Sequence, residues 1–183
     1  MEREHASPDS AEYAEMVAEV FIDTVRKSAG RLTCPGDSAE LTPALMECLQ
    51  YVYLHDTSHV CEIASGLEMS LSGASQLVDR LVRKSMITRS ENERDRRLTR
   101  IDLTQAGREA VKQMRRRKSE WFDAILEAMP HSQRKAFREG LESFLKVALS
   151  GEDNIDRACV KCGMEHAPFC VVSKVRSKRT AAH

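Results

Sequence analysis

The spacing of apolar residues follows two different periods along the chain. Over most of residues 8–84 and 104–149, apolar side chains recur every three or four positions, which is typical of helices with one buried face. Residues 99–103 instead alternate apolar or β-branched side chains with charged ones, which is the period of a half-buried strand. The pattern predicts a mainly α-helical protein that contains one small β-hairpin.

Helix-capping residues mark where several of these helices begin. A hydroxyl residue followed by proline occurs at Ser7-Pro8 and again at Thr42-Pro43, and Thr104 precedes the long apolar pattern after the hairpin. Pro130 interrupts that pattern. The expected helices span residues 8–30, 43–53, 58–67, 72–84, 105–128 and 132–149. The expected strands span residues 86–89 and 98–103.

Two short helices joined by a tight turn, with the hairpin directly after them, predict a winged helix-turn-helix at about residues 41–103. In this motif the second helix enters the major groove of duplex DNA, so its N-terminal end needs short polar side chains. The candidate groove-contacting residues of this helix are Ser70, Ser72, Ser75, Gln76 and Arg80. For Ser72, an alternative role is to cap the helix without touching a base.

The tip of the hairpin carries the strongest chemical signal, in the run Arg94-Asp95-Arg96-Arg97. An arginine held at a hairpin tip can enter a narrow minor groove, where the negative potential is enhanced. Asp95 lies two residues before Arg97, so both side chains can emerge on one side of a strand and form a bidentate pair. The alternative is an exposed ion pair without a function.

The charge distribution supports a polyanionic partner. The chain has a formal net charge of zero, yet residues 76–118 contain 14 Lys and Arg against 6 Asp and Glu, a net charge of +8. Such a basic block on a projecting motif is the electrostatic footprint of a nucleic-acid-binding surface. A solvated charged face is the less specific interpretation.

These motifs together resemble the multiple-antibiotic-resistance-regulator (MarR) family. The resemblance covers about residues 13–149 and rests on Leu41-Thr42-Pro43, the helix-turn-helix of residues 60–84, the wing Arg94-Asp95-Arg96-Arg97, and Leu103-Thr104-Gln105-Ala106-Gly107-Arg108. In that family the wing often reads Asp-x-Arg-Asp-Arg-Arg, and here Asn92 replaces the first Asp. The resemblance implies that Arg97 is the minor-groove arginine and that Asp95 orients it.

The resemblance also implies a homodimer that binds a pseudopalindromic double-stranded operator. N- and C-terminal dimerisation helices, at about residues 8–30 and 104–149, would interlock within a domain of residues 8–150. These helices carry broad apolar faces that a winged helix alone cannot bury, including Phe21, Trp121, Phe122, Phe137 and Phe144. A monomer whose helices fold back onto its own core is the alternative.

Residues 151–183 form a tail with a cluster of metal-ligating side chains. Cys159, Cys162, His166 and Cys170 follow the spacing Cys-x2-Cys-x3-His-x3-Cys. Two thiolates two residues apart can hold one ion from a turn, and the four groups suit tetrahedral zinc. An iron–sulfur cluster is the alternative cofactor. The site could also be a structural staple without a regulatory role.

Two further expectations concern four isolated residues. Cys48 and Cys61 fall within expected helices and are interpreted as small core residues. His55 and His59 flank a turn and are expected at the surface.

The leading hypothesis is a sequence-specific, homodimeric transcriptional regulator, usually a repressor, that responds to a small-molecule effector, a metal or a redox signal. The alternative is a metal- or redox-binding protein whose winged helix contacts protein rather than DNA. No Gly-rich phosphate loop or nucleophile elbow indicates an enzyme. The chain has no apolar run near the ~20 residues that span a bilayer, and no signal pattern, so we expect a cytoplasmic protein without a membrane partner.

Overall fold

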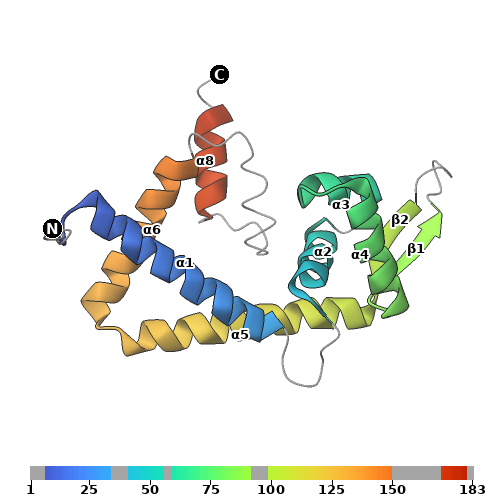
Figure 1. Cartoon of the computed structure of the whole chain (residues 1–183), viewed down its shortest axis with the longest axis horizontal. Coiled ribbons are helices and arrows are strands. Elements are labelled where there is room, and N and C mark those ends of the chain that lie inside the picture. Colours follow the sequence, from blue (N-terminus) through green and yellow to red (C-terminus); the bar gives the residue numbers. More distant parts are fainter. Residues whose placement is uncertain (1–6, 34–40, 56–58, 92–98, 150–169, 181–183) are drawn as a thin grey trace, which may run out of the picture. The chain divides into compact units, whose positions relative to one another are not determined.

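The computed structural model describes residues 7–33, 41–55, 59–91, 99–149 and 170–180 (Figure 1). The chain divides into two compact units, Met1–Pro43 and Ala44–His183. The helices are α1 (Ala11–Thr33), α2 (Pro43–Leu54), α3 (Val60–Gly66), α4 (Leu71–Arg83), α5 (Gln105–Ala128), α6 (His131–Ala148) and α8 (Val171–Thr180). The strands are β1 (Ile87–Glu91) and β2 (Thr99–Leu103). The predicted mainly helical fold with one hairpin is confirmed, whereas the predicted domain boundaries stay a prediction.

The core of the second unit lies where α2, α3, α4 and the hairpin meet the first half of α5. Its fully buried side chains are Leu45, Cys48, Leu49, Val52, Ile63, Val78, Leu81, Ile87, Ile101 and Val111. Burial raises the pKa of the Cys48 thiol to about 12, so this cysteine stays protonated and acts as a small apolar side chain, as predicted. The same prediction is wrong for Cys61, which is exposed because α3 buries only its opposite side, at Ile63 and Ala64.

The N-cap of α4, the second helix of the helix-turn-helix, is Ser70 and not Ser72. Ser70 is the N-cap of α4, and its hydroxyl accepts a hydrogen bond from the Gly73 N–H at 3.1 Å. The Ser72 side chain instead lies 3.1 Å from the Ser70 hydroxyl. The cap role, one of the two roles considered for Ser72, is therefore wrong, and α4 starts one residue earlier than expected.

The hairpin is a two-stranded antiparallel sheet in which Ile87 pairs with Leu103, and Glu91 with Thr99. Ile87, Ile101 and Leu103 are buried, which confirms the predicted alternation on the second strand. The first strand runs two residues further toward the tip than expected, to Glu91, because its partner Thr99 opens β2.

The first turn of α5 packs against the turn between α4 and β1. Thr104 is the N-cap, as predicted: its hydroxyl accepts a hydrogen bond from the Gly107 N–H at 3.1 Å. The same hydroxyl lies 2.8 Å from the Ser85 carbonyl oxygen and 2.9 Å from that of Met86. A Cβ atom on Gly107 would overlap the Met86 carbonyl oxygen and lie 3.0 Å from Leu103 Cδ2. The Leu-Thr-x-x-Gly sequence thus joins the hairpin to α5.

We expect Gly107→Ala to lower the free energy of unfolding by about 1–3 kcal/mol, because the added methyl group would push the backbone of α5 away from the Met86 carbonyl group in a packed site. The matched control is Gly140→Ala in α6, where an added Cβ meets nothing within 4 Å. That change should raise the free energy of unfolding by about 0.5–1 kcal/mol through helix propensity. Urea denaturation of the two variants measures both effects, and equal stability of the variants would contradict this account.

A helix that was not predicted from the sequence, α8, lies within the tail. Val172 and Val175 of α8 are buried, and Leu149, Cys170 and Val171 pack against them. Lys174 Nζ lies 2.9 Å from Glu142 Oε1 of α6. Hydrogen bonds from Lys174 and Lys146 lower the pKa of Glu142 to about 2. The ion pair therefore supports α8 docking fully above about pH 4.5 and is lost as the pH falls toward 2.

Among the described residues, none of the helices is both long enough and apolar enough to cross a membrane.

Candidate nucleic-acid interface

The predicted groove-contacting residues of α4 lie on its solvent side. Ala74, Leu77, Val78 and Leu81 fill the buried face. Ser72, Gln76 and Arg80 are exposed at successive turns on the other side, and Ser75 is partly exposed beside them. The hydroxyl of Ser70 already serves as the helix cap, so its role at this surface is to fix where the helix starts.

Leu71 is a surface residue that the sequence analysis missed. It is the first residue of α4 and its side chain is 60% exposed, next to Ser72. An exposed apolar side chain at the start of a groove-entering helix can contact the methyl group of thymine. Sequence reasoning selected only polar residues here, and the signal that would have found Leu71 is its position outside the buried helical face.

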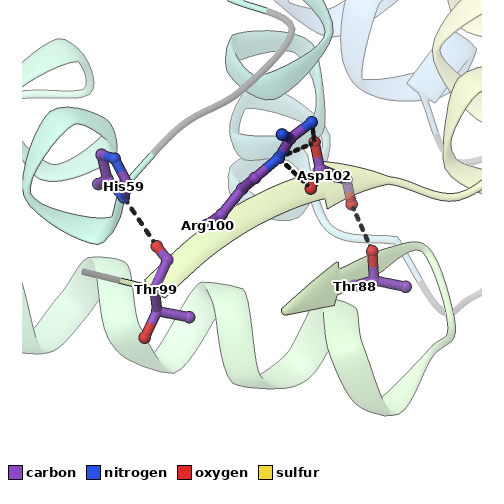
Figure 2. Close-up of polar contacts among 5 residues, drawn as sticks. All are labelled: His59, Thr88, Thr99, Arg100 and Asp102. Carbon is purple, nitrogen blue, oxygen red and sulfur yellow. Dashed lines mark hydrogen bonds and ion pairs between the residues drawn. The ribbon is translucent and has the colours of Figure 1, made fainter. Parts of the chain in front are cut away.

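The predicted wing-tip residues, Arg94, Asp95, Arg96 and Arg97, lie outside the described residues. An arginine–carboxylate pair of the predicted kind instead occurs on β2, between Arg100 and Asp102. The Arg100 Nε lies 2.8 Å and its Nη2 2.9 Å from the two carboxylate oxygens of Asp102 (Figure 2). The spacing of two residues places both side chains on the same face of β2, as was expected of Asp95 and Arg97.

Two polar contacts attach the hairpin to the helix-turn-helix. On β1, Arg89 Nη1 lies 2.7 Å from Asp79 Oδ1 of α4. On β2, the Thr99 carbonyl oxygen lies 2.9 Å from Nδ1 of His59, the residue before α3 (Figure 2). His59 is the N-cap residue of α3, and it is half-buried rather than a free surface residue as expected.

Several basic residues of α5 are engaged in local contacts, two of them in ion pairs within the helix and one in a contact with α2. Lys112 lies 3.5 Å from Glu109, and Arg116 lies 3.5 Å from Glu120. The Arg115 guanidinium lies 5.4 Å from the ring centroid of Tyr53, a cation–π contact that joins α5 to α2. Local contacts thus engage Lys112, Arg115 and Arg116 of α5.

Of the four predicted metal ligands, Cys159, Cys162 and His166 lie outside the described residues. Cys170 is half-buried at the start of α8. Burial raises the pKa of its thiol. Hydrogen bonds from Ser173 and from the Val172 N–H, together with the charge of Lys174, lower the pKa by more, so the net shift is downward. No group of three potential ligands occurs within the described part of the chain.

Comparison with known proteins identifies the helix-turn-helix and most of the wing. The model of the MarR family matches residues 41–99. The chain carries a MarR family domain. This match begins at Leu41 and ends at the first residue of β2, so it covers the predicted winged helix up to its last strand.

Curated relatives of the MarR domain come from Bacillus subtilis (strain 168). The HTH-type transcriptional regulator YpoP is 40% identical over 63 residues, which are 34% of this chain and 45% of that protein. The HTH-type transcriptional repressor MdtR is 36% identical over 67 residues, 37% of this chain and 43% of that protein. The chain spans less than two thirds of the length of the relatives it matches.

Solved structures share the fold of the MarR domain and the helices that flank it. Rv1404 from Mycobacterium tuberculosis superposes with a TM-score of 0.71 at 21% identity, over 81% of this chain and 99% of that one. Streptococcus pneumoniae FabT, solved in complex with DNA, gives a TM-score of 0.63 at 16% identity, over 77% of this chain and 98% of that one. The predicted winged helix-turn-helix fold is confirmed.

Proposed function

We propose that the protein is a sequence-specific DNA-binding transcriptional regulator that acts as a homodimeric repressor. The observation that carries this proposal is the polar, solvent-facing side of α4, formed by Ser72, Gln76 and Arg80, beside a hairpin that Arg89 ties to the same helix. Support comes from the MarR domain and from relatives whose names describe transcriptional regulators. The proposal involves no catalytic step.

The recognition step places the N-terminal end of α4 in the major groove. The helix dipole and the free N–H groups there attract a phosphate. Ser72 and Gln76 can hydrogen-bond base edges, Arg80 can pair with a guanine or a phosphate, and Leu71 can contact a thymine methyl group. Each good bidentate base contact contributes about 1–3 kcal/mol of discrimination.

The wing then extends from the same surface toward the flanking minor groove. In this proposal Arg97, oriented by Asp95, enters that groove, and Arg94 and Arg96 contact the phosphates beside it. The tie between Asp79 and Arg89 supports this arrangement, because it makes the hairpin and the recognition helix one body.

A second copy of the chain is the proposed partner of the apolar helix faces outside the MarR domain. On α1, Met16, Val20 and neighbouring apolar residues are exposed, with 63% of the Val20 side chain open to solvent. On α6, which has no buried residue in the single chain, Phe144 is 67% and Val147 77% exposed. Apolar surface of this extent marks an interface. Two-fold symmetry would then set the DNA half-sites about 10 bp apart, one helical turn.

The experiment that tests the function is genomic footprinting with the purified full chain, followed by titration of the selected duplex over a range of salt concentrations. Since each neutralised phosphate releases counterions, we expect the logarithm of the affinity to fall steeply with the logarithm of salt, with a slope of about −0.9 per phosphate contact. A chain that selects no sequence and shows a flat salt response would favour the alternative, a metal- or redox-binding protein whose winged helix contacts protein.

We also propose that the tail binds one zinc ion through Cys159, Cys162, His166 and Cys170, and that this site or a small-molecule effector regulates DNA binding. The donor types and their spacing support it, and the net lowering of the Cys170 pKa favours the thiolate that zinc requires.

The metal proposal predicts about one zinc per chain in protein purified without added metal, by elemental analysis. The double variant Cys159→Ser, Cys162→Ser should lose the metal, whereas Cys48→Ser should keep it, because Cys48 is buried in the core. A visible absorption band with bound iron would instead indicate the iron–sulfur cluster. If the double variant keeps the operator affinity of the parent protein and its response to chelator and oxidant, the metal site has a structural role and does not regulate DNA binding.

A further inference from the structure

His59 connects two elements that lie far apart in the sequence. Its backbone is extended at the N-cap position of α3, and its N–H donates a hydrogen bond to Glu62 Oε2 at 2.8 Å. Its ring reaches across to β2, where Nδ1 lies 2.9 Å from the carbonyl oxygen of Thr99, 40 residues further along the chain (Figure 2). The residue is thus held at its main chain by α3 and at its ring by the hairpin.

The chemistry of this contact fixes the proton on the ring. A carbonyl oxygen can only accept a hydrogen bond, so His59 Nδ1 must carry the hydrogen, in the neutral ring as in the charged one. Among the described residues the sheet consists of β1 and β2, and Glu91 pairs with Thr99 at its end. The His59 ring therefore contacts β2 at its first residue, which follows the arginine-bearing residues 92–98 in the sequence.

We propose that His59 is a positioning residue for the wing, a role that rests on the proposed DNA-binding function. The Asp79–Arg89 pair anchors β1 to α4, and the His59–Thr99 hydrogen bond anchors β2 to α3. With both strands anchored, Glu91 and Thr99, the two ends between which residues 92–98 lie in the sequence, are held at a fixed distance from the recognition helix. Without the second anchor, ordering the hairpin would oppose DNA binding.

Three substitutions separate this role from the cap position that His59 also occupies. In His59→Asn the amide nitrogen lies two bonds from Cβ, as Nδ1 does, so the donor to Thr99 is kept. In His59→Gln the amide lies one bond further out, near the place of Nε2. In His59→Ser the hydroxyl caps α3 well but is too short to reach Thr99.

We measure operator affinity of the full-length variants at one salt concentration. His59→Asn should bind within about 2-fold of the parent protein, while His59→Gln and His59→Ser should each bind about 10-fold more weakly, as expected from losing one modest hydrogen bond per protomer. Thermal unfolding of the Ser variant should differ from that of the Asn variant by no more than the loss of one modest hydrogen bond, since both residues are good caps. Parent-like affinity of His59→Ser, or an Asn variant as weak as the Ser variant, would overturn the proposal.

Hydrogen exchange on the free protein separates this inference from the function on which it rests. Amides of residues 99–103 should exchange faster in His59→Ser and His59→Gln than in the parent protein and in His59→Asn. If the parent protein selects no duplex, the proposed function fails, and the exchange rates still decide whether His59 anchors β2. Equal exchange in all four proteins would refute the anchor even if the parent protein binds DNA tightly.

Discussion

Exchanging Arg97 for Glu is expected to weaken operator binding on the order of 100-fold or more, with the fold and the oligomeric state unchanged. Each wing of the dimer loses a groove contact of about 1–3 kcal/mol, and about 1.4 kcal/mol corresponds to a tenfold change. The new carboxylate also meets the negative potential of a narrow minor groove. Fluorescence anisotropy with the footprinted duplex, at fixed salt, measures the loss.

The matched control for this prediction is Lys135→Glu on α6, which makes the same charge change at an exposed residue outside the winged helix. It should change the affinity only slightly, so the Arg97 effect cannot be a general loss of positive charge. Asp95→Asn should cost less than Arg97→Glu, because it removes only the orienting partner. An Arg97→Glu protein that binds its operator as tightly as the parent protein would contradict the wing hypothesis.

Arg100, which pairs with Asp102, is a second candidate for the minor-groove contact that the Arg97 variant tests. Its guanidinium is held by two carboxylate oxygens at the root of the wing, and 49% of the Arg100 side chain is exposed. If Arg97→Glu leaves binding unchanged while Arg100→Ala weakens it, the groove contact lies at the root of the hairpin and not at its tip. Measuring the two variants side by side locates the contact.

Local signals in the sequence were sufficient for most of the fold. Thr104 caps α5 as predicted, because its hydroxyl has a backbone N–H within one turn to satisfy. Ser70 and Ser72 are equally good caps by residue type, and the choice between them depends on where the preceding turn ends. Glu68 adopts a left-handed φ of 52° there, so the chain leaves the turn early and Ser70 takes the cap position.

Contacts between distant elements were not predictable from the sequence. The pattern placed His59 and Asp79 on helices and Arg89 on a strand, but no periodicity tells which polar groups meet across 10 or 40 residues. Helix α8 was missed for a related reason. Its apolar residues are few, and its order comes from packing Val172 and Val175 against α6, which a short isolated segment does not reveal.

The second large effect is expected from the apolar faces of α1 and α6. The double variant Val20→Asp, Phe144→Asp places a charge on each face, where 63% and 67% of the parent side chains are exposed in the single chain. Burying either carboxylate against a second copy would be costly, so the dimer should dissociate at concentrations where the parent protein is dimeric. Operator affinity should fall by about 10²–10⁴, since the two winged helices no longer bind as one unit.

Sedimentation velocity gives the oligomeric state, and circular dichroism checks that the variant stays folded, as expected for residues that are exposed within one chain. The control is Glu15→Lys with Lys135→Glu, two exposed positions about 140° and 180° around the same helices at 3.6 residues per turn. That protein keeps its net charge and should remain dimeric. A Val20→Asp, Phe144→Asp protein that sediments as a dimer would place the two-fold interface on other surfaces, and a monomeric parent protein would exclude the homodimer altogether.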